Sequence, residues 1–246
     1  AFEHGYEMYG VDILNRMYEF SKQFGEYLHD TYRGSMPDDP QRNFDMLDIK
    51  TQANVDFDGT KGAKGVPAWT GEGDNDFRNC PSGRQVYDQI PFMLINPAEN
   101  GRKACIGLSG AKGYKLSAII PFNKKTQSLY FLHTLCINAG VSTTNAGTII
   151  LRYADNSTFT DVVDNSKVGN WWYPEKKGRA RRALTIDNAK TTSVGAYVYG
   201  LNNPYSEKMI KSIELQGFDL ESKWMVLGIT ASDYPVYYRP DIISYG

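Results

Sequence analysis

The sequence predicts an all-β protein, an antiparallel β-sandwich preceded by an amphipathic helix. Three observations support this prediction. From Phe44 onward, short β-rich runs alternate with Gly, Asn, Asp and Pro, which favour turns. These runs are not separated by convincing helical patterns, which argues against a parallel α/β sheet. The first 33 residues differ, because their apolar residues recur at helical spacing.

The amphipathic helix is predicted over residues 11–32. Five apolar residues at intervals of three and four form one face of it: Ile13, Met17, Phe20, Phe24 and Leu28. The Gly and Pro residues at 34–40 then end the helix. Such a face must be buried, either on the sandwich or within a catalytic domain that lies upstream. We therefore divide the chain into a helical segment with linker, 1–43, and a sandwich domain, 44–246.

Eleven short segments are predicted to be strands because they are rich in β-branched and aromatic residues. In chain order they are 46–57, 85–95, 104–108, 116–121, 128–137, 148–153, 158–163, 181–186, 194–199, 210–215 and 225–230. The two longest intervals, 58–84 and 164–180, are predicted to be loops. Loops of this length in a compact domain are usually functional.

Composition narrows the classes of partner. The chain of 246 residues has 27 basic and 28 acidic residues, so its net charge of −1 gives no reason to expect nucleic acid or an anionic membrane as partner. No apolar stretch approaches the roughly 18 residues that span a bilayer. The three cysteines match no zinc pattern, and Cys105 and Cys136 lie in apolar runs that predict burial. Because the chain begins at Ala1 without Met, we expect a mature form or a fragment.

A run of three aromatic residues in the second long loop is the first candidate binding site. Trp171, Trp172 and Tyr173 lie between Asn170 and Pro174. Neighbouring residues of an extended chain point to opposite sides, so one tryptophan is expected in the core and the other at a surface that suits the apolar face of a sugar ring. Asn170, Arg179 and Arg181 would donate hydrogen bonds to sugar hydroxyls or carboxylates. In the alternative, both rings cap the core and the arginines are solvated.

Alternating acids in the first long loop form the second candidate, a calcium site. Glu72, Asp74 and Asp76 lie among glycines, and calcium prefers carboxylate and carbonyl oxygens. The spacing is not that of an EF-hand, so two alternatives stay open. In the first the acids are solvated, and in the second Arg78 pairs with Asp74 or Asp76 and holds the loop shut.

Catalytic and metal motifs are weak by comparison. His133 lies in an apolar strand, so we predict a core histidine with both ring nitrogens hydrogen-bonded rather than a base or metal ligand. No nucleophile elbow, phosphate-binding glycine loop or His-Glu-x-x-His motif is present in the sequence. An enzyme is the minority interpretation.

Several sequence segments, taken in chain order, resemble those of the galactose-binding-like jelly-roll modules that accompany bacterial glycoside hydrolases. They span roughly residues 66–231 and are Trp69–Asn79, Pro81–Gln85, Ile90–Pro97, Leu129–Thr134, Leu151–Ser157, Asn170–Trp172 and Asn202–Pro204. Where the family usually has Asp-Gly, this chain has Asp155-Asn156, and Asn also accepts the left-handed conformation of a turn.

The resemblance implies a non-catalytic, secreted or cell-surface module that targets a glycoside hydrolase to a polysaccharide. Its implied partners are a polysaccharide or oligosaccharide and an adjoining catalytic domain, with at most one structural calcium ion as cofactor. Trp69 and Arg78 join the aromatic loop as candidate sugar contacts. Two alternatives remain: a structural β-sandwich that packs on a catalytic domain without binding sugar, and a polysaccharide-degrading enzyme on a jelly-roll scaffold.

Overall fold

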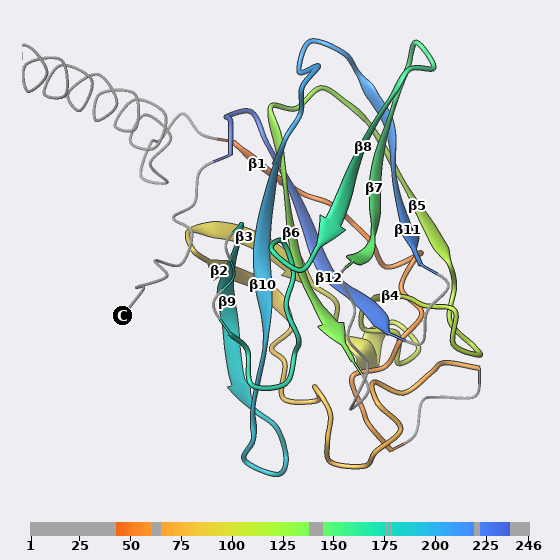
Figure 1. Cartoon of the computed structure of the whole chain (residues 1–246), viewed down its shortest axis with the longest axis vertical. Coiled ribbons are helices and arrows are strands. Elements are labelled where there is room, and N and C mark those ends of the chain that lie inside the picture. The colour runs from red at the N-terminus through yellow and green to blue at the C-terminus, as the bar shows by residue number, and fades with distance from the viewer. Residues whose placement is uncertain are drawn as a thin grey trace, which may run out of the picture. The chain divides into compact units, whose positions relative to one another are not determined.

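The computed structural model describes residues 43–60, 65–137, 145–175, 177, 179–218 and 222–236. The helix predicted over residues 11–32 lies outside these residues, as does most of the segment 1–43. Within the described residues the chain is all-β, and the only helical element is the short 3-10 turn η1 (Pro97–Glu99). All strand pairs are antiparallel, as the sequence predicted (Figure 1).

Two sheets and one hairpin contain all the strands described. The larger sheet has the order β1-β12-β6-β10-β9, and β4 also pairs with β12. Its strands are β1 (Phe44–Met46), β4 (Ile106–Leu108), β6 (Ser128–Cys136), β9 (Ala180–Asp187), β10 (Ser193–Asn202) and β12 (Lys223–Ser232). The smaller sheet has the order β5-β11-β7-β8 and consists of β5 (Ser117–Lys124), β7 (Asn145–Tyr153), β8 (Thr158–Asp164) and β11 (Ile210–Gly217). The hairpin joins β2 (Gly83–Tyr87) to β3 (Ile90–Leu94).

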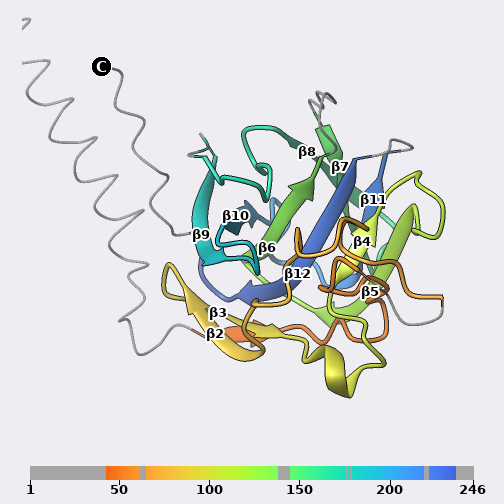
Figure 2. The same cartoon turned by 90° about the horizontal axis from the view of Figure 1, so that it is seen from below.

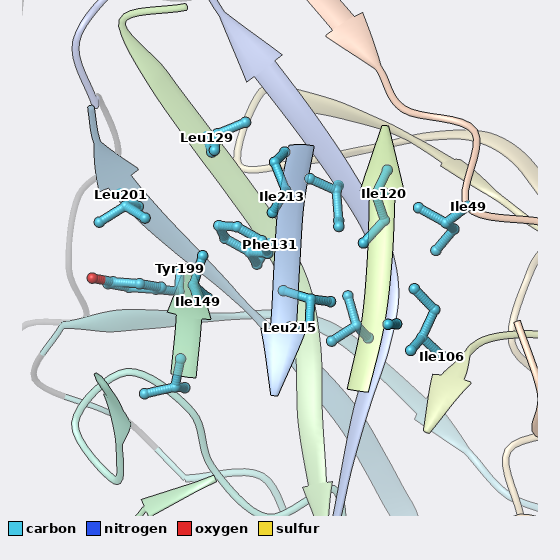
Figure 3. Packing of buried hydrophobic residues seen from close by; sticks show 14 of the residues in the cluster. Ile49, Ile106, Ile120, Leu129, Phe131, Ile149, Tyr199, Leu201, Ile213 and Leu215 are labelled. Carbon is cyan, nitrogen blue, oxygen red and sulfur yellow. The ribbon is translucent and has the colours of Figure 1, made fainter. Parts of the chain in front are cut away.

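The first hydrophobic core lies between the two sheets, so the fold is a β-sandwich. Figure 3 shows Ile120, Ile149 and Ile213 of the smaller sheet packed with Phe131 and Tyr199 of the larger one. On β5 buried and exposed residues alternate, because only one face of that strand points into this core.

A second hydrophobic core covers the other face of the larger sheet. Leu132 of β6 and Leu227 of β12 pack there with Phe92 of the hairpin and with Trp69 and Phe77 of the first long loop. Figure 2 shows β2 and β3 on one side of β12, with β7, β8 and β11 on the other. Because both faces of the sheet are covered, every residue of β6 and β12 is buried. This explains why residues 128–136 are mostly apolar and show no regular alternation with polar residues.

Nine of the eleven predicted strands are confirmed, with ends that differ by a few residues. Segment 46–57 was wrong, because the strand there ends at Met46. The chain then runs irregularly to a bridge between Val55 and Cys105, and its apolar side chains enter the cores without a strand. Segment 85–95 was also wrong, since it is a hairpin rather than one strand. Asp88 and Gln89 form its turn, with positive φ of 51° and 66°.

The turn between β7 and β8 places an asparagine in the left-handed conformation. Asn156 has a φ of 66°, and its backbone N–H donates to the Tyr153 carbonyl. Asn adopts this positive φ more readily than most other non-glycine residues.

Candidate functional site

The long loops meet at one end of the larger sheet. There β6 ends at Cys136, and its partner β12 begins at Lys223. The second long loop runs beside the same end of β6, because Leu135 forms a parallel bridge with Asn170. The aromatic loop, residues 169–174, is thus held by backbone hydrogen bonds rather than by its side chains alone.

Trp171 is the tryptophan of this loop that packs in the second hydrophobic core. Its N–H donates to the Leu135 carbonyl at 2.8 Å, and its carbonyl accepts from Gly195 N–H at 2.8 Å. The ring is only 3% exposed and lies edge-on to Trp69, with ring centroids 5.7 Å apart. A ring so buried offers no face to a ligand, so the candidate sugar contact at Trp171 does not fit its position.

Trp172 and Tyr173 leave an aromatic surface at this end of the sandwich. Trp172 is half-buried against the second core and bridges Val194 of β10. Tyr173 is 62% exposed, and its ring centroid lies 5.6 Å from that of Trp172, at an interplanar angle of 83°. The backbone fixes this arrangement, because Tyr173 N–H donates to the Ser193 carbonyl and Tyr173 has a positive φ of 46°. The pair is divided as strand geometry predicted, with the second ring nearer the solvent.

The polar residues predicted to assist the aromatic loop differ in how they are placed. The Asn170 Oδ1 atom faces Trp172 N–H at 3.5 Å, so this side chain supports the loop. Arg181 is ion-paired with Asp88 of the hairpin turn, with 2.6 Å between Nη1 and Oδ1. Arg179 is exposed, but it precedes Ala180, which pairs with Tyr199 of β10, whereas Trp172 bridges Val194 near the start of that strand. The strand register therefore does not bring Arg179 beside the two aromatic rings.

Trp69 is wholly buried, so the structure contradicts its assignment as a sugar contact. Its ring stacks on Phe77 with centroids 4.7 Å apart and planes 12° apart, and Phe57 lies edge-on to both rings. In the sequence Trp69 precedes Gly71 and Gly73, which favour a surface loop. In the fold this loop is instead anchored through its tryptophan in the second core.

Arg78 pairs with the acids of its own loop. Its guanidinium contacts the wholly buried carboxylate of Asp76 and lies 3.1 Å from Asp74 Oδ1. Asp76 Oδ2 also accepts from Gly59 N–H at 3.2 Å, while the nearest partner of Glu72 is Asn75, at 3.4 Å. Asp74 and Asp76 thus face Arg78, which is the ion-paired alternative that the sequence left open, whereas the Glu72 carboxylate accepts from the Asn75 side-chain amide.

A second arginine extends this charged cluster. Arg102 lies 2.7 Å from Asp56 Oδ2 and 3.1 Å from Asp58 Oδ2. The pKa of Asp58 is lowered to about 2, mainly by hydrogen bonds from Thr60, with smaller contributions from Arg102 and Arg78. Among the described residues no three Asp, Glu, His or Cys side chains gather as metal ligands would. The carboxylates present fit arginine better than calcium, and the predicted ion stays a prediction.

His133 is the core histidine that the sequence predicted. Trp224 Nε1–H donates to His133 Nδ1 at 3.1 Å, so the ring proton lies on Nε2, which donates to the Lys167 carbonyl at 3.0 Å. Burial lowers the pKa of His133 to about 4. A neutral ring with both nitrogens occupied serves the packing of the core and has no free position for a metal or a substrate.

A pocket of about 340 Å3 opens at the same end of the larger sheet. Three segments line it: the first long loop, the turn after β4 and the first residue of β12. The lining residues are Pro67, Ala68, Thr70, Gly71, Ala111, Lys112, Tyr114 and Lys223. Lys223 and Tyr114 were not predicted as site residues from the sequence. The available signal was a single charged residue two positions before a predicted apolar strand, which by itself does not indicate a site.

Comparisons of the chain with family models, with curated proteins and with solved structures find no match. Within the described residues, no helix is long and apolar enough to cross a membrane.

Proposed function

We propose that this chain is a non-catalytic, secreted carbohydrate-binding module of the jelly-roll type that targets an attached glycoside hydrolase to a polysaccharide. The observation that carries the proposal is the aromatic surface of Trp172 and Tyr173, fixed by backbone hydrogen bonds at a loop-rich end of the sandwich. An exposed aromatic surface calls for a ligand, and the apolar faces of sugar rings suit it.

The strand order gives the proposal its second support. With β1 as the first strand, the orders β1-β12-β6-β10 and β5-β11-β7-β8 are those of an eight-stranded jelly roll, to which β9 adds one edge strand. Jelly rolls host many functions, so the order supports the fold of the proposed family and leaves the activity to the site.

Binding would be non-covalent. A sugar ring stacks on the exposed face of Trp172 or Tyr173. The affinity of a single site is modest, because the contact must exceed the costs of ordering and desolvation. Attachment to a catalytic domain compensates by raising that domain's effective concentration at the polymer.

Affinity electrophoresis against a panel of plant and algal polysaccharides tests the proposal. We expect at least one polysaccharide to retard the chain, and Trp172→Ala and Tyr173→Ala to weaken the retardation about tenfold or more. Tyr205→Ala is the matched control, because Tyr205 is an exposed tyrosine at the other end of the sandwich, beside the turn between β5 and β6. Absence of retardation, or equal retardation of all variants, would refute the aromatic platform.

A further inference from the structure

The pocket beside the first long loop contains a buried lysine, and in the described part of the chain no acidic side chain pairs with it. Lys223 is 7% exposed, and its Nζ lies 3.4 Å from the Trp69 carbonyl oxygen and 5.4 Å from the centre of the Tyr114 ring. Among the described residues, no carboxylate lies within ion-pairing distance of this ammonium group. Burial of a charge is costly unless it is paired, so the position is explained best by a negatively charged partner.

The other walls of the pocket also favour an anion. Lys112 lines the pocket with Lys223, and none of the eight lining residues is acidic. Glu72, which follows the lining residue Gly71, is exposed, and its Oε2 faces Asn75. The two lysines thus give the pocket a net positive charge.

One wall of the pocket is aromatic and held in place. The Tyr114 hydroxyl donates to the Ala68 carbonyl at 2.9 Å, and Tyr114 N–H donates to the Ala111 carbonyl. Burial raises the pKa of Tyr114, so the phenol stays neutral and keeps this hydrogen bond. A fixed ring beside an ammonium group offers an apolar wall and a cation within one small space.

We propose that this pocket binds the carboxylate-bearing ring of an acidic sugar, a uronate unit of the polysaccharide that the module recognises. The carboxylate accepts hydrogen bonds from Lys223 Nζ, the sugar ring lies against Tyr114, and Lys112 adds positive charge at the rim. A volume of about 340 Å3 is near the lower limit of small-molecule sites, which suits a single sugar ring. The inference rests on the proposed carbohydrate-binding function and assigns it a substrate class.

Calorimetric titration of the whole chain with galacturonic acid, and with galactose as the neutral probe, tests this site. We expect galacturonic acid to bind at least about tenfold more tightly than galactose, because a hydrogen bond to a charged group is worth more than a neutral one. Lys223→Met should abolish that preference, whereas Lys211→Met, at an exposed lysine of β11, should preserve it. Ala111→Trp fills the pocket and retains Lys223, so it should also abolish binding of the acid.

Equal affinity of the wild-type chain for the two sugars, or no binding of galacturonic acid, would overturn the inference. Unchanged binding by both Lys223→Met and Ala111→Trp would overturn it as well. A thermal melt of each variant shows whether it is folded, and the two variants disturb the site in different ways. If neutral polysaccharides are retarded through Trp172 and Tyr173 while galacturonic acid does not bind, the pocket inference fails and the proposed function stands. If galacturonic acid binds while no polysaccharide is retarded, the aromatic platform alone fails.

Discussion

His133 lies at the centre of a buried polar network between the two sheets. Its ring contacts Trp224 and the Lys167 carbonyl, while Lys167 Nζ lies 2.7 Å from Asp161 Oδ1, and Tyr199 donates to the same carboxylate. Each of these polar groups has a partner, which is the condition under which burial of charge is tolerated. Protonation of the ring is not compatible with this network, because Nδ1 would lose its role as an acceptor.

Stability should therefore fall as the pH falls through the range in which only the unfolded chain binds a proton at His133. The ordinary pKa of histidine is 6.5, and in the folded protein it is lowered to about 4 by burial. The contribution of the neutral His133 ring to stability is complete above pH 6.5 and is lost between pH 6.5 and 4. It amounts to about 3 kcal/mol of unfolding free energy. Chemical unfolding at several pH values measures this slope.

His133→Gln is the matched variant, since its amide both donates and accepts hydrogen bonds but does not titrate. Its stability at neutral pH should be lower than that of the wild type, and the decline between pH 6.5 and 4 should be smaller. Equal slopes for the two chains would mean that other groups cause the acid sensitivity of this fold.

Single residues show how far the sequence could predict the candidate site. The alternation of an extended chain was sufficient to predict that Trp171 and Trp172 would be divided between the core and the surface. It was not sufficient to predict that Trp69 is buried. The nearby glycines indicate a surface loop, whereas the Trp69 ring stacks on Phe77 in the second core. Lys223 could not be predicted as a site residue either. The pocket environment of its ammonium group is formed by Tyr114 and Trp69, which are distant in the sequence.

At the level of elements, the first long loop is closed by arginine–carboxylate pairs. Arg78 connects the wholly buried Asp76 with Asp74, and Arg102 connects Asp56 with Asp58. Loss of Arg78 would leave the buried carboxylate of Asp76 without its cation. Arg78 is itself partly exposed, so we expect Arg78→Gln to cost only about 2 kcal/mol.

Thermal melts with and without a chelator separate this arrangement from the calcium site predicted from the sequence. We expect Arg78→Gln to lower the Tm and the chelator to leave the Tm of the wild type unchanged. Arg84→Gln, at an exposed arginine of β2, is the control for loss of charge. A chelator that lowers the Tm while Arg78→Gln does not would show that calcium rather than arginine holds the loop.

The strands that were predicted correctly have a strong local signal, and the two errors lie where that signal is ambiguous. Apolar alternation or continuous apolar runs mark β5, β6 and β12. In the β2–β3 hairpin, Asp88 and Gln89 take the positive φ that Asn-Gly usually takes, so the turn is not visible in the sequence. The apolar residues of 47–57 pack into the cores from irregular backbone, which periodicity cannot distinguish from a strand.

At the scale of the whole molecule, the larger sheet belongs to two cores at once. On β6, Phe131 points into the core between the sheets, whereas Tyr130 and Leu132 point into the second core. The sequence predicted antiparallel strands, but it gave no evidence for a second layer of loops over the sheet. That layer depends on contacts of β6 and β12 with the first long loop and the hairpin, which local patterns do not encode.

Because β6 and β12 contribute to both cores, the described domain should unfold as one cooperative unit. Phe131 lies in the core between the sheets and Phe92 in the second core, and both are wholly buried. We expect Phe131→Ala and Phe92→Ala each to cost about 3–5 kcal/mol and to shift the same calorimetric transition. Tyr173→Ala, at an exposed ring, should leave that transition in place. If Phe92→Ala instead produced a separate early transition and left the main one unmoved, the outer layer would be an independent unit, and the larger sheet would not couple the two cores.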